Sequence, residues 1–371
     1  GRSPPQLSAN SSLVKRMRIA IDLQATAGQT TGFGRYVHQL RSALTTVAPP
    51  DVTFRDIITI KRNLNTPKRM LWDQLGLPLA AAWRRPDVLF VPAFSPPVLW
   101  PGKLVVTCHD LIGRLFPQYF SRTARAYWHD LLPAGVRHAD HVLVISESTK
   151  RDVVRHLGIP PSRISVTPLG VDAKFKPVTD PALVDRVRHT YNLPRPYCIA
   201  IGTIEPRKNY PFLVDAFGVA KREDHDLVIV GKRGWDASAL DQRIRQYHMG
   251  DRVRVLEYVA EDDLVPLLGG ATALLFPSRY EGFGLPVLEA MACGVPVIAS
   301  TASSIPEVGG EAVLYADPSD KEAWQAQIGR IIADASLRAK LRAQGLARAA
   351  TFTWTRTAQL TLEALLTVAR A

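Results

Sequence analysis

The chain has 371 residues, of which 46% are hydrophobic and 22% charged, a composition typical of a globular protein with room for two domains. Its three cysteines, Cys108, Cys198 and Cys293, lie far apart and form no CxxC or Cys/His metal spacing, which excludes a disulfide framework and fits a reducing compartment. The formal net charge is +12, and residues 1–185 hold nearly all of it, with 24 Lys and Arg against 13 Asp and Glu.

A basic first half of this kind indicates nucleic acid, an anionic membrane surface or a polyanionic substrate, or else an ordinary solvated surface. Residues 1–16 are polar, rich in Ser and Pro, and lack the apolar core of a signal peptide, so we expect a disordered leader. No apolar run approaches the roughly 18 residues that a membrane-spanning helix needs, so we expect no such helix.

Strand-like and helix-like segments alternate through the first half of the chain. An amphipathic helix is predicted over residues 34–44, and a second helix over 146–158, between a Ser cap and a Gly. The apolar runs between turn signals predict strands over residues 17–23, 52–60, 87–93, 103–110, 140–146 and 164–172.

The alternation restarts after a stretch rich in Pro and charge at 173–196, with a helix near 210–221. Its strands are predicted over residues 197–204, 226–232, 252–259, 271–278 and 295–300. Short apolar runs separated by helices indicate parallel sheets covered on both faces. We therefore predict an α/β protein of two facing, doubly wound domains, 17–185 and 186–353, with a ligand site in the cleft between them.

The stretch RYEGFGLPVLEAMACGVPVIAS, residues 279–300, concentrates the chemistry of the second half. It follows a predicted strand, and Pro286 suits the first position of a helix, so a helix is expected to begin there. Glycines at 282 and 284 let the backbone pass close to a ligand. The amides of the helix start then make an anion site. We expect the free amides of Phe283, Gly284, Leu285 and Val287 to point into the cleft.

Two glutamates, Glu281 and Glu289, flank this turn eight residues apart. Glu289, one turn into the helix, suits the vicinal hydroxyls of a ribose, and Glu281, before the turn, suits a sugar. A pair of surface acids near a helix start is the alternative. The ordered composite of strand, glycine turn, helix and buried strand favours a site.

These residues resemble the E-x7-E signature of the retaining glycosyltransferases of family 4, which have the GT-B fold of two Rossmann-like domains. The resemblance covers nearly the whole chain after residue 16. It implies that residues 354–371 form a terminal helix that crosses back to the first domain. It also implies transfer of a sugar from a nucleotide-sugar donor, with retention of the anomeric configuration.

The segment IGTIEPRKN, residues 201–209, resembles the phosphate-binding segment of the family, which assigns Arg207 and Lys208 to the donor diphosphate. Two adjacent cations after a strand are suited to the charge of a leaving diphosphate. The resemblance makes Glu281, His109, Lys208 and Arg207 the expected catalytic residues. No residue is evidently placed as a covalent nucleophile, so we expect a front-side displacement, with Glu281 as the alternative base or nucleophile.

The loop at residues 26–37 is similar to the glycine-rich loop of the family, which places Gly32, Phe33 and Gly34 against the donor. A GxG after a first strand also begins a dinucleotide fingerprint, but Val37 stands where that fingerprint has its third glycine, and a nicotinamide enzyme is disfavoured. The segment VVTCHDLI, residues 105–112, resembles the family's T-x-H-D segment. There His109 would contact the sugar and Asp110 the acceptor.

Three further segments match the family. Ser146 would cap a helix directed toward the cleft, and Lys232 would touch a phosphate. The backbone of Val259 and Ala260 would read the base. Asp224-His225-Asp226 has the D-x-D spacing of metal-dependent transferases, but it precedes a strand and so falls on the far side of the sheet. We therefore expect no catalytic metal and no cofactor beyond the donor.

The motif combination looks most like bacterial mannosyltransferases of lipopolysaccharide and exopolysaccharide assembly, which implies GDP-mannose as donor and a polyprenol-diphosphate-linked glycan or an oligosaccharide as acceptor. A UDP-sugar donor stays open. We expect a cytoplasmic protein, peripheral at the inner face of the membrane. The segment at residues 61–72, which mixes four cations with Leu and Trp, would make the contact, unless it is an ordinary exposed loop.

Two other classes of protein would share some of these features. A nucleic-acid-binding protein would show aromatic residues interleaved with basic ones, or a recognised module, and the sequence has neither. A sugar-nucleotide enzyme other than a transferase, such as an epimerase or a phosphorylase, or a non-catalytic GT-B partner protein, would share the fold. The presence of Arg207, Lys208, Glu281 and Glu289 favours the transferase.

Overall fold

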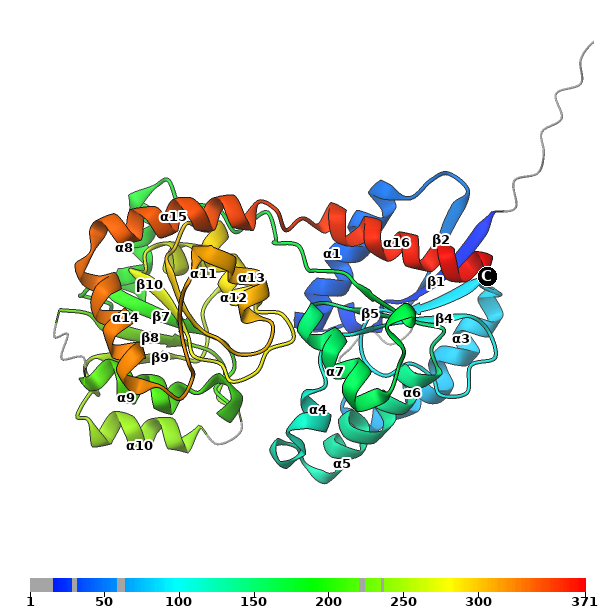
Figure 1. Ribbon diagram of the computed structural model, residues 1–371, viewed down its shortest axis with the longest axis horizontal. Coiled ribbons are helices and arrows are strands. Elements are labelled where there is room, and N and C mark those ends of the chain that lie inside the picture. Colours follow the sequence, from blue (N-terminus) through cyan, green and yellow to red (C-terminus); the bar gives the residue numbers. More distant parts are fainter. Residues whose placement is uncertain (1–15, 29–31, 59–63, 220–223, 235–236) are drawn as a thin grey trace, which may run out of the picture.

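The computed structural model describes residues 16–28, 32–58, 64–219, 224–234 and 237–371. It contains two six-stranded parallel sheets, each with helices on both faces (Figure 1), which confirms the predicted α/β class. The strands of the first sheet are β1 Met17–Asp22, β2 Val52–Ile57, β3 Val88–Val91, β4 Leu104–Cys108, β5 His141–Val144 and β6 Ile164–Val166. Those of the second are β7 Tyr197–Ile201, β8 Asp226–Val230, β9 Val253–Leu256, β10 Ala273–Phe276, β11 Val297–Ser300 and β12 Leu314–Ala316.

The helices of the first domain connect its strands or flank them. They are α1 Gly32–Val47, α2 Thr66–Leu71, α3 Leu77–Arg84, α4 Ile112–Leu115, α5 Arg122–Arg125, α6 Leu132–His138 and α7 Glu147–Leu157. The later helices are α8 Pro181–Thr190, α9 Tyr210–Val219, α10 Ser238–Gln246, α11 Glu261–Gly269, α12 Leu285–Ala292, α13 Ile305–Gly309, α14 Lys321–Ala333, α15 Ala335–Ala349 and α16 Trp354–Arg370.

Both sheets reverse their strand order once, and the two reversals fix where ligands can enter. The first sheet runs β2-β1-β3-β4-β5-β6 and the second β12-β11-β10-β7-β8-β9. The loops after β1 and β3, and those after β7 and β10, therefore diverge to opposite faces of their sheets. In open parallel sheets the crevice opens at that point, beyond the carboxyl ends of the strands.

The predicted strands are mostly too long at their carboxyl ends. β4 ends at Cys108, so His109 and Asp110 belong to the loop beyond the sheet. The short strand β12, at one edge of the second sheet, was not predicted, because three residues, two half-buried and one buried, carry no usable period. Helix α7 agrees with the prediction, since Ser146 caps its start and Gly158 ends it with φ of +70°.

The structure moves the boundary between the two domains. The predicted division between residues 185 and 186 falls inside α8, and α8 packs on α11 of the second domain. The boundary therefore precedes α8. Helix α16 packs on α1, so the chain ends on the domain in which it begins (Figure 1).

The structure also corrects the predicted exposed element at residues 61–72. Residues 59–63 lie outside the described residues, and Lys68 is exposed. Arg69 and Trp72, however, are buried, because they lie on the inner face of α2 and of the π turn Trp72–Gly76 that continues it. The segment is thus the start of a helical run and not a loop. No helix in the described ranges is both long and apolar enough to cross a bilayer.

Candidate active site

The loops after β7 and β10 meet at the reversal point of the second sheet. The loop after β7 holds the 3₁₀ turn Pro206–Lys208, and the loop after β10 holds Glu281. Because β7 and β10 are neighbours, residues separated by more than seventy positions in the chain come into contact there. The structure therefore brings the predicted site residues Arg207, Lys208 and Glu281 together.

The Glu281 carboxylate lies between two cations. Lys208 Nζ donates to its Oε1 at 2.7 Å, and Arg207 Nη1 lies 2.6 Å from its Oε2. Arg207 also pairs with Glu205 at 2.6 Å and donates to the carbonyl of Tyr280 at 3.0 Å. The side chains of Lys208 and Glu281 are buried. Each cation expected to bind the diphosphate is thus already held by a carboxylate, which fixes its direction.

Charge sets the protonation states in this cluster. Burial alone raises the pKa of Glu281, but Lys208 and Arg207 outweigh it and bring the pKa down to about 2. Burial lowers the pKa of Lys208, and Glu281 opposes that change. We conclude that Glu281 is ionised at neutral pH and that it holds both cations in place.

Helix α12 begins at this cluster. Gly284, with φ of +114°, is its N-cap, a conformation that suits glycine, and Pro286 stands in its first turn, one position later than predicted. The predicted set of open amides needs one correction, because the amide of Val287 donates to the Gly284 carbonyl at 3.0 Å. The amides of Phe283, Gly284 and Leu285 remain as the candidate anion-binding end of the helix.

Glu289 lies in the second turn of α12. Burial raises its pKa to about 7, with Arg35 and Lys174 opposing this effect and Asp172 adding to it. Arg35 belongs to α1 of the first domain, so Glu289 faces across the cleft. It does not share the environment of Glu281, and the two glutamates differ in protonation near neutral pH.

Gly282 lies at one of the contacts between the two domains. A Cβ built on it would lie 2.3 Å from the His109 carbonyl oxygen, so the glycine is required by the first domain's backbone. The Gly282 carbonyl accepts from Ser146 Oγ at 2.8 Å. The room predicted for a ligand at this glycine is therefore taken by the neighbouring domain.

His109 and Asp110 stand on the first domain's side of the contact. His109 Nε2 donates to the Pro92 carbonyl at 2.8 Å, which leaves Nδ1 as the ring's acceptor. Burial lowers its pKa to about 4, so the ring is neutral. Burial raises the pKa of Asp110, which accepts from the Ile112 amide at 3.0 Å and feels the charge of Arg207.

The predicted glycine loop begins α1. Gly32 is the first residue of the helix, with open space around it, and Gly34 is buried in the same turn. The Phe33 ring packs edge-on to His109, with centroids 4.9 Å apart, and against Phe94 at 5.1 Å. Residues 29–31 of this loop lie outside the described residues. Phe33 thus contacts the predicted sugar-binding histidine.

The loops predicted for the nucleotide follow β8 and β9. Ala260 caps α11, and its amide N–H is not free to donate to a ligand, because it donates to the Tyr191 hydroxyl at 3.2 Å. Val259 is half-buried, whereas the ring of Tyr258 beside it is 82% exposed. Lys232, after β8, is exposed. These residues border the same carboxyl edge of the sheet, but Tyr258 was not singled out from the sequence.

The D-x-D triplet lies at the opposite edge. Asp226 is the first residue of β8 and pairs with Arg195 at 3.0 Å. Asp226 and His225 are buried, so the predicted solvated turn holds for Asp224 alone. Across the part of the chain that the structure describes, no three His, Cys, Asp or Glu side chains are grouped to hold a metal ion.

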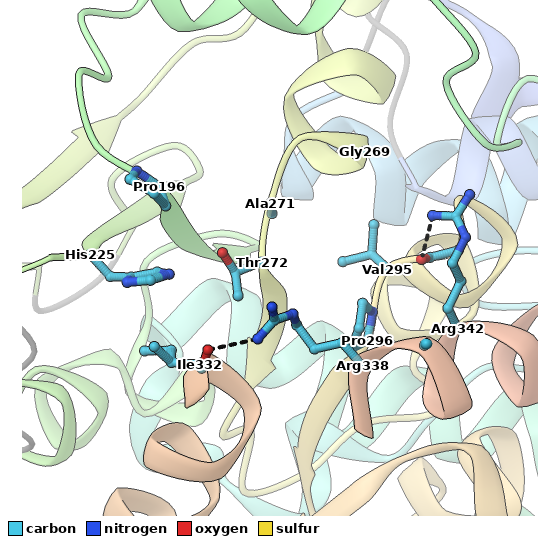
Figure 2. Close-up of a pocket in the computed structure, with 12 residues that line it drawn as sticks. Pro196, His225, Gly269, Ala271, Thr272, Val295, Pro296, Ile332, Arg338 and Arg342 are labelled. Carbon is cyan, nitrogen blue, oxygen red and sulfur yellow. Dashed lines mark hydrogen bonds between the residues drawn. The ribbon is translucent and has the colours of Figure 1, made fainter. Parts of the chain in front are cut away.

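A hollow of about 440 Å³ lies at the amino edge of the second sheet and belongs to no predicted site. Figure 2 shows its two arginines turned onto carbonyl groups. Arg338 donates to the carbonyls of Ile331 and Ile332, and Arg342 to that of Gly294. Both arginines thus satisfy carbonyl groups at or just after helix C-termini. They are already engaged, and the hollow shows no evident anion site.

Comparison with known proteins identifies the family to which this chain belongs. The family models for glycosyl transferases group 1 and glycosyltransferase family 4 match residues 184–348 and 32–175. The O-antigen chain mannosyltransferase B of Escherichia coli is 35% identical over 284 residues, 75% of this chain and 74% of that one. The chain belongs to glycosyltransferase family 4.

Two other similar proteins delimit the relationship. The serotype-specific mannosyltransferase WbdA of Escherichia coli is 28% identical over 82% of this chain, which spans 40% of that protein. The solved structure of sucrose-phosphate synthase from Thermosynechococcus elongatus matches with a TM-score of 0.73 and 23% identity, covering 96% of this chain and 100% of that one. At 23% identity, this structural match establishes only the fold of the glycosyltransferase, which is GT-B.

Sequence reasoning missed several residues that shape the site of this glycosyltransferase. Glu307, in α13, accepts from the amides of Glu147 and Ser148 at 2.7 Å each and so caps α7 across the domain boundary. Tyr280 donates to Asp152 at 2.8 Å. Tyr280 stands beside Glu281 in the signature, which is a signal that was available, whereas nothing local to Glu307 indicates a partner 160 positions away.

The buried pair predicts a specific pattern of stability. Lys208→Met leaves Glu281 with one cation fewer, and Glu281→Gln leaves the buried Lys208 without its carboxylate and Arg207 with Glu205 alone. We expect each to lower the free energy of unfolding by roughly 3–5 kcal/mol, the usual cost of an unpaired buried charge. The double variant should lose clearly less than the sum of the two, since it removes the pair together.

Denaturant unfolding of the four proteins measures this coupling. Lys340→Met, at an exposed lysine of the second domain, is the control and should be near neutral. Additive losses in the double variant would contradict the pairing.

Proposed function

We propose that this glycosyltransferase transfers mannose from GDP-mannose, with retention and without a metal, to a lipid-linked or oligosaccharide acceptor in lipopolysaccharide or exopolysaccharide synthesis. The names of its relatives, O-antigen chain mannosyltransferase B above all, support mannose and the surface glycan. The observation that carries the chemistry is the Arg207–Lys208–Glu281 cluster at the open end of α12.

The donor fits the second domain by charge and position. Its diphosphate would meet Lys208, Arg207 and the amides of residues 283–285, where a helix end and two cations favour an anion. Its ribose would meet Glu289. The base would lie near Val259, with the exposed ring of Tyr258 as a surface on which it can stack.

In the proposed reaction, negative charge develops on the leaving diphosphate. The acceptor hydroxyl oxygen bonds to the anomeric carbon as the bond from that carbon to the phosphate oxygen breaks. The acceptor proton passes to an oxygen of the leaving diphosphate. The developing negative charge is stabilised by cations that Glu281 has already oriented, so little reorganisation is needed.

The protonation state of Glu281 bears on its role. A carboxylate with a pKa near 2, held by two cations, is a weak base and a weak nucleophile. This supports front-side displacement over a covalent intermediate on Glu281. The neutral His109 ring, with Nδ1 as acceptor, is suited to a sugar hydroxyl, and Asp110 faces the acceptor's side of the cleft.

The basic first domain supports a peripheral position at the inner face of the cytoplasmic membrane, where a polyprenol-diphosphate acceptor would be found. Anionic lipid attracts such a surface. The same charge, without aromatic interleaving, gives no support to nucleic acid.

Calorimetric titration with GDP, UDP and ADP, with and without magnesium, tests the donor. We expect GDP to bind and the others to bind much more weakly, with no dependence on magnesium, because protein cations face the diphosphate. Preference for UDP would replace the donor but keep the fold and the chemistry. Absence of binding by all three would overturn the proposed function.

Kinetics separate chemistry from folding. Lys208→Met should lower kcat by about 10²–10³, the effect of removing one stabilising group from developing charge. The double variant Lys208→Met, Glu281→Gln should regain stability but stay as slow, because the cation is still missing. Near-normal turnover in either, measured against Lys340→Met, would contradict the role given to Lys208.

Donor affinity should depend on pH through Glu289. Its pKa is about 7, above the ordinary value, so the folded protein ionises it only as the pH rises through about 7. An ionised carboxylate accepts ribose hydroxyls better than a protonated one. We therefore expect the Kd for GDP to fall between pH 6 and 8, by at most about tenfold per unit.

Calorimetry of Glu289→Gln at the same pH values is the check, since an amide does not titrate in this range. Its Kd should show no change, while the exposed control Glu311→Gln should behave as the wild type. A pH dependence that survives in Glu289→Gln would assign the titration to another group.

A further inference from the structure

A continuous helical run in the first domain presents an apolar stripe to solvent. The run comprises α2, the π turn Trp72–Gly76 and α3. Four large side chains along it are mostly exposed, Leu71 at 61%, Leu75 at 56%, Leu79 at 72% and Trp83 at 88%. Single exposed hydrophobic residues are ordinary, but four in register on one run are not.

The geometry of the run keeps these four side chains on one face. Residues four apart on an α-helix drift by about 40° per step, because each residue turns about 100°. The wider π turn in the middle offsets part of that drift. The opposite face carries Trp72, Asp73, Leu77 and Ala81, all buried against the first sheet and its neighbours. The run therefore has one face in the core and one apolar face outside.

Cations border the stripe. Arg18, Arg55 and Arg84 line one hollow of about 610 Å³ with Leu79 and Trp83. Lys68 and Arg85 are exposed at the two ends of the run. Arg18 pairs with Asp87, at 3.3 Å. The single acid within residues 66–85 is Asp73, which is buried on the inner face. An apolar stripe with a basic rim matches the interface of an anionic bilayer, where Trp and Leu enter and cations meet headgroups.

A second copy of the chain fits this surface less well. A two-fold interface would place the same patch against itself, and the basic rim of one copy would meet the basic rim of the other. The stripe itself offers no acid to relieve that repulsion. A nucleic acid would use the cations but leave the four apolar side chains in water.

We propose that the outer face of residues 71–83, with Arg55 and Arg84, docks this protein on an anionic lipid surface. The proposal rests on the proposed function where it concerns the acceptor, and it names the contact surface. On the inner face of the same run, Arg69 pairs with Asp73 at 3.5 Å and acts on Asp22, the last residue of β1 at the reversal point of the first sheet. One helical run thus joins the lipid surface to the acceptor side of the cleft.

Vesicle flotation with the full chain tests the surface. The probes are phosphatidylcholine vesicles with and without phosphatidylglycerol, and the variants are Leu79→Ser with Trp83→Ser, and Arg55→Gln with Arg84→Gln. The apolar pair should weaken binding to anionic vesicles by more than about tenfold. The basic pair should weaken it by about fivefold for each cation removed and abolish the preference for phosphatidylglycerol.

Leu183→Ser, at an exposed leucine of α8 in the second domain, is the matched control and should float as the wild type does. GDP binding by calorimetry should be unchanged in every variant, because none lies at the donor site. The proposal is overturned by a wild type that binds neither vesicle, or by an apolar pair that binds normally. It is also overturned if the pair converts a dimer to a monomer, seen by sedimentation, without changing flotation. If the wild-type chain floats with anionic vesicles but binds no GDP, the proposed function is wrong and the docking surface stands.

Discussion

The ion pairs made by Glu281 are the interaction on which the rest of the site depends. One carboxylate joins the loop after β7, through Lys208 and Arg207, to the loop after β10. Burial of a single cation at that point would be costly, and burial of two would be more so. The pairing makes it possible to bury Lys208, to leave Arg207 only partly exposed, and to aim both cations at one place. In the proposed reaction, the donor diphosphate would meet charges whose desolvation and orientation are already accomplished.

The same turn also carries the contact between the domains. Gly282 follows Glu281 directly, and its backbone lies against His109 and accepts from Ser146. Glu307 adds a carboxylate at the N-terminus of α7, where a helix favours negative charge. Movement of the first domain relative to the second must therefore disturb the turn that holds the cation cluster. The cation cluster and the contact between the domains are thus coupled through two consecutive residues, Glu281 and Gly282.

Much of this arrangement could be predicted from the sequence, and what could not has physical reasons. Apolar runs of four to six residues located nearly every strand, and the glycine turn before Pro286 located the start of α12. The pairing of Lys208 with Glu281 is a contact between distant parts of the chain, which no local pattern encodes. Gly282 was predicted to make room for a ligand because the sequence does not say which backbone will approach it.

The inner and outer faces of residues 66–84 show the limit most clearly. Apolar residues occur on almost every side of this run, so hydrophobic periodicity cannot tell which face is buried. The deciding feature is the ion pair of Arg69 with Asp73, one turn apart, which must be turned inward because Asp73 has Asp22 and Tyr127 as neighbours. Once this polar pair is fixed in the core, the leucines at 71, 75 and 79 have only solvent to face. The buried polar pair thus determines which apolar side chains stay outside, and the exposed stripe is a consequence of the polar contacts beneath it.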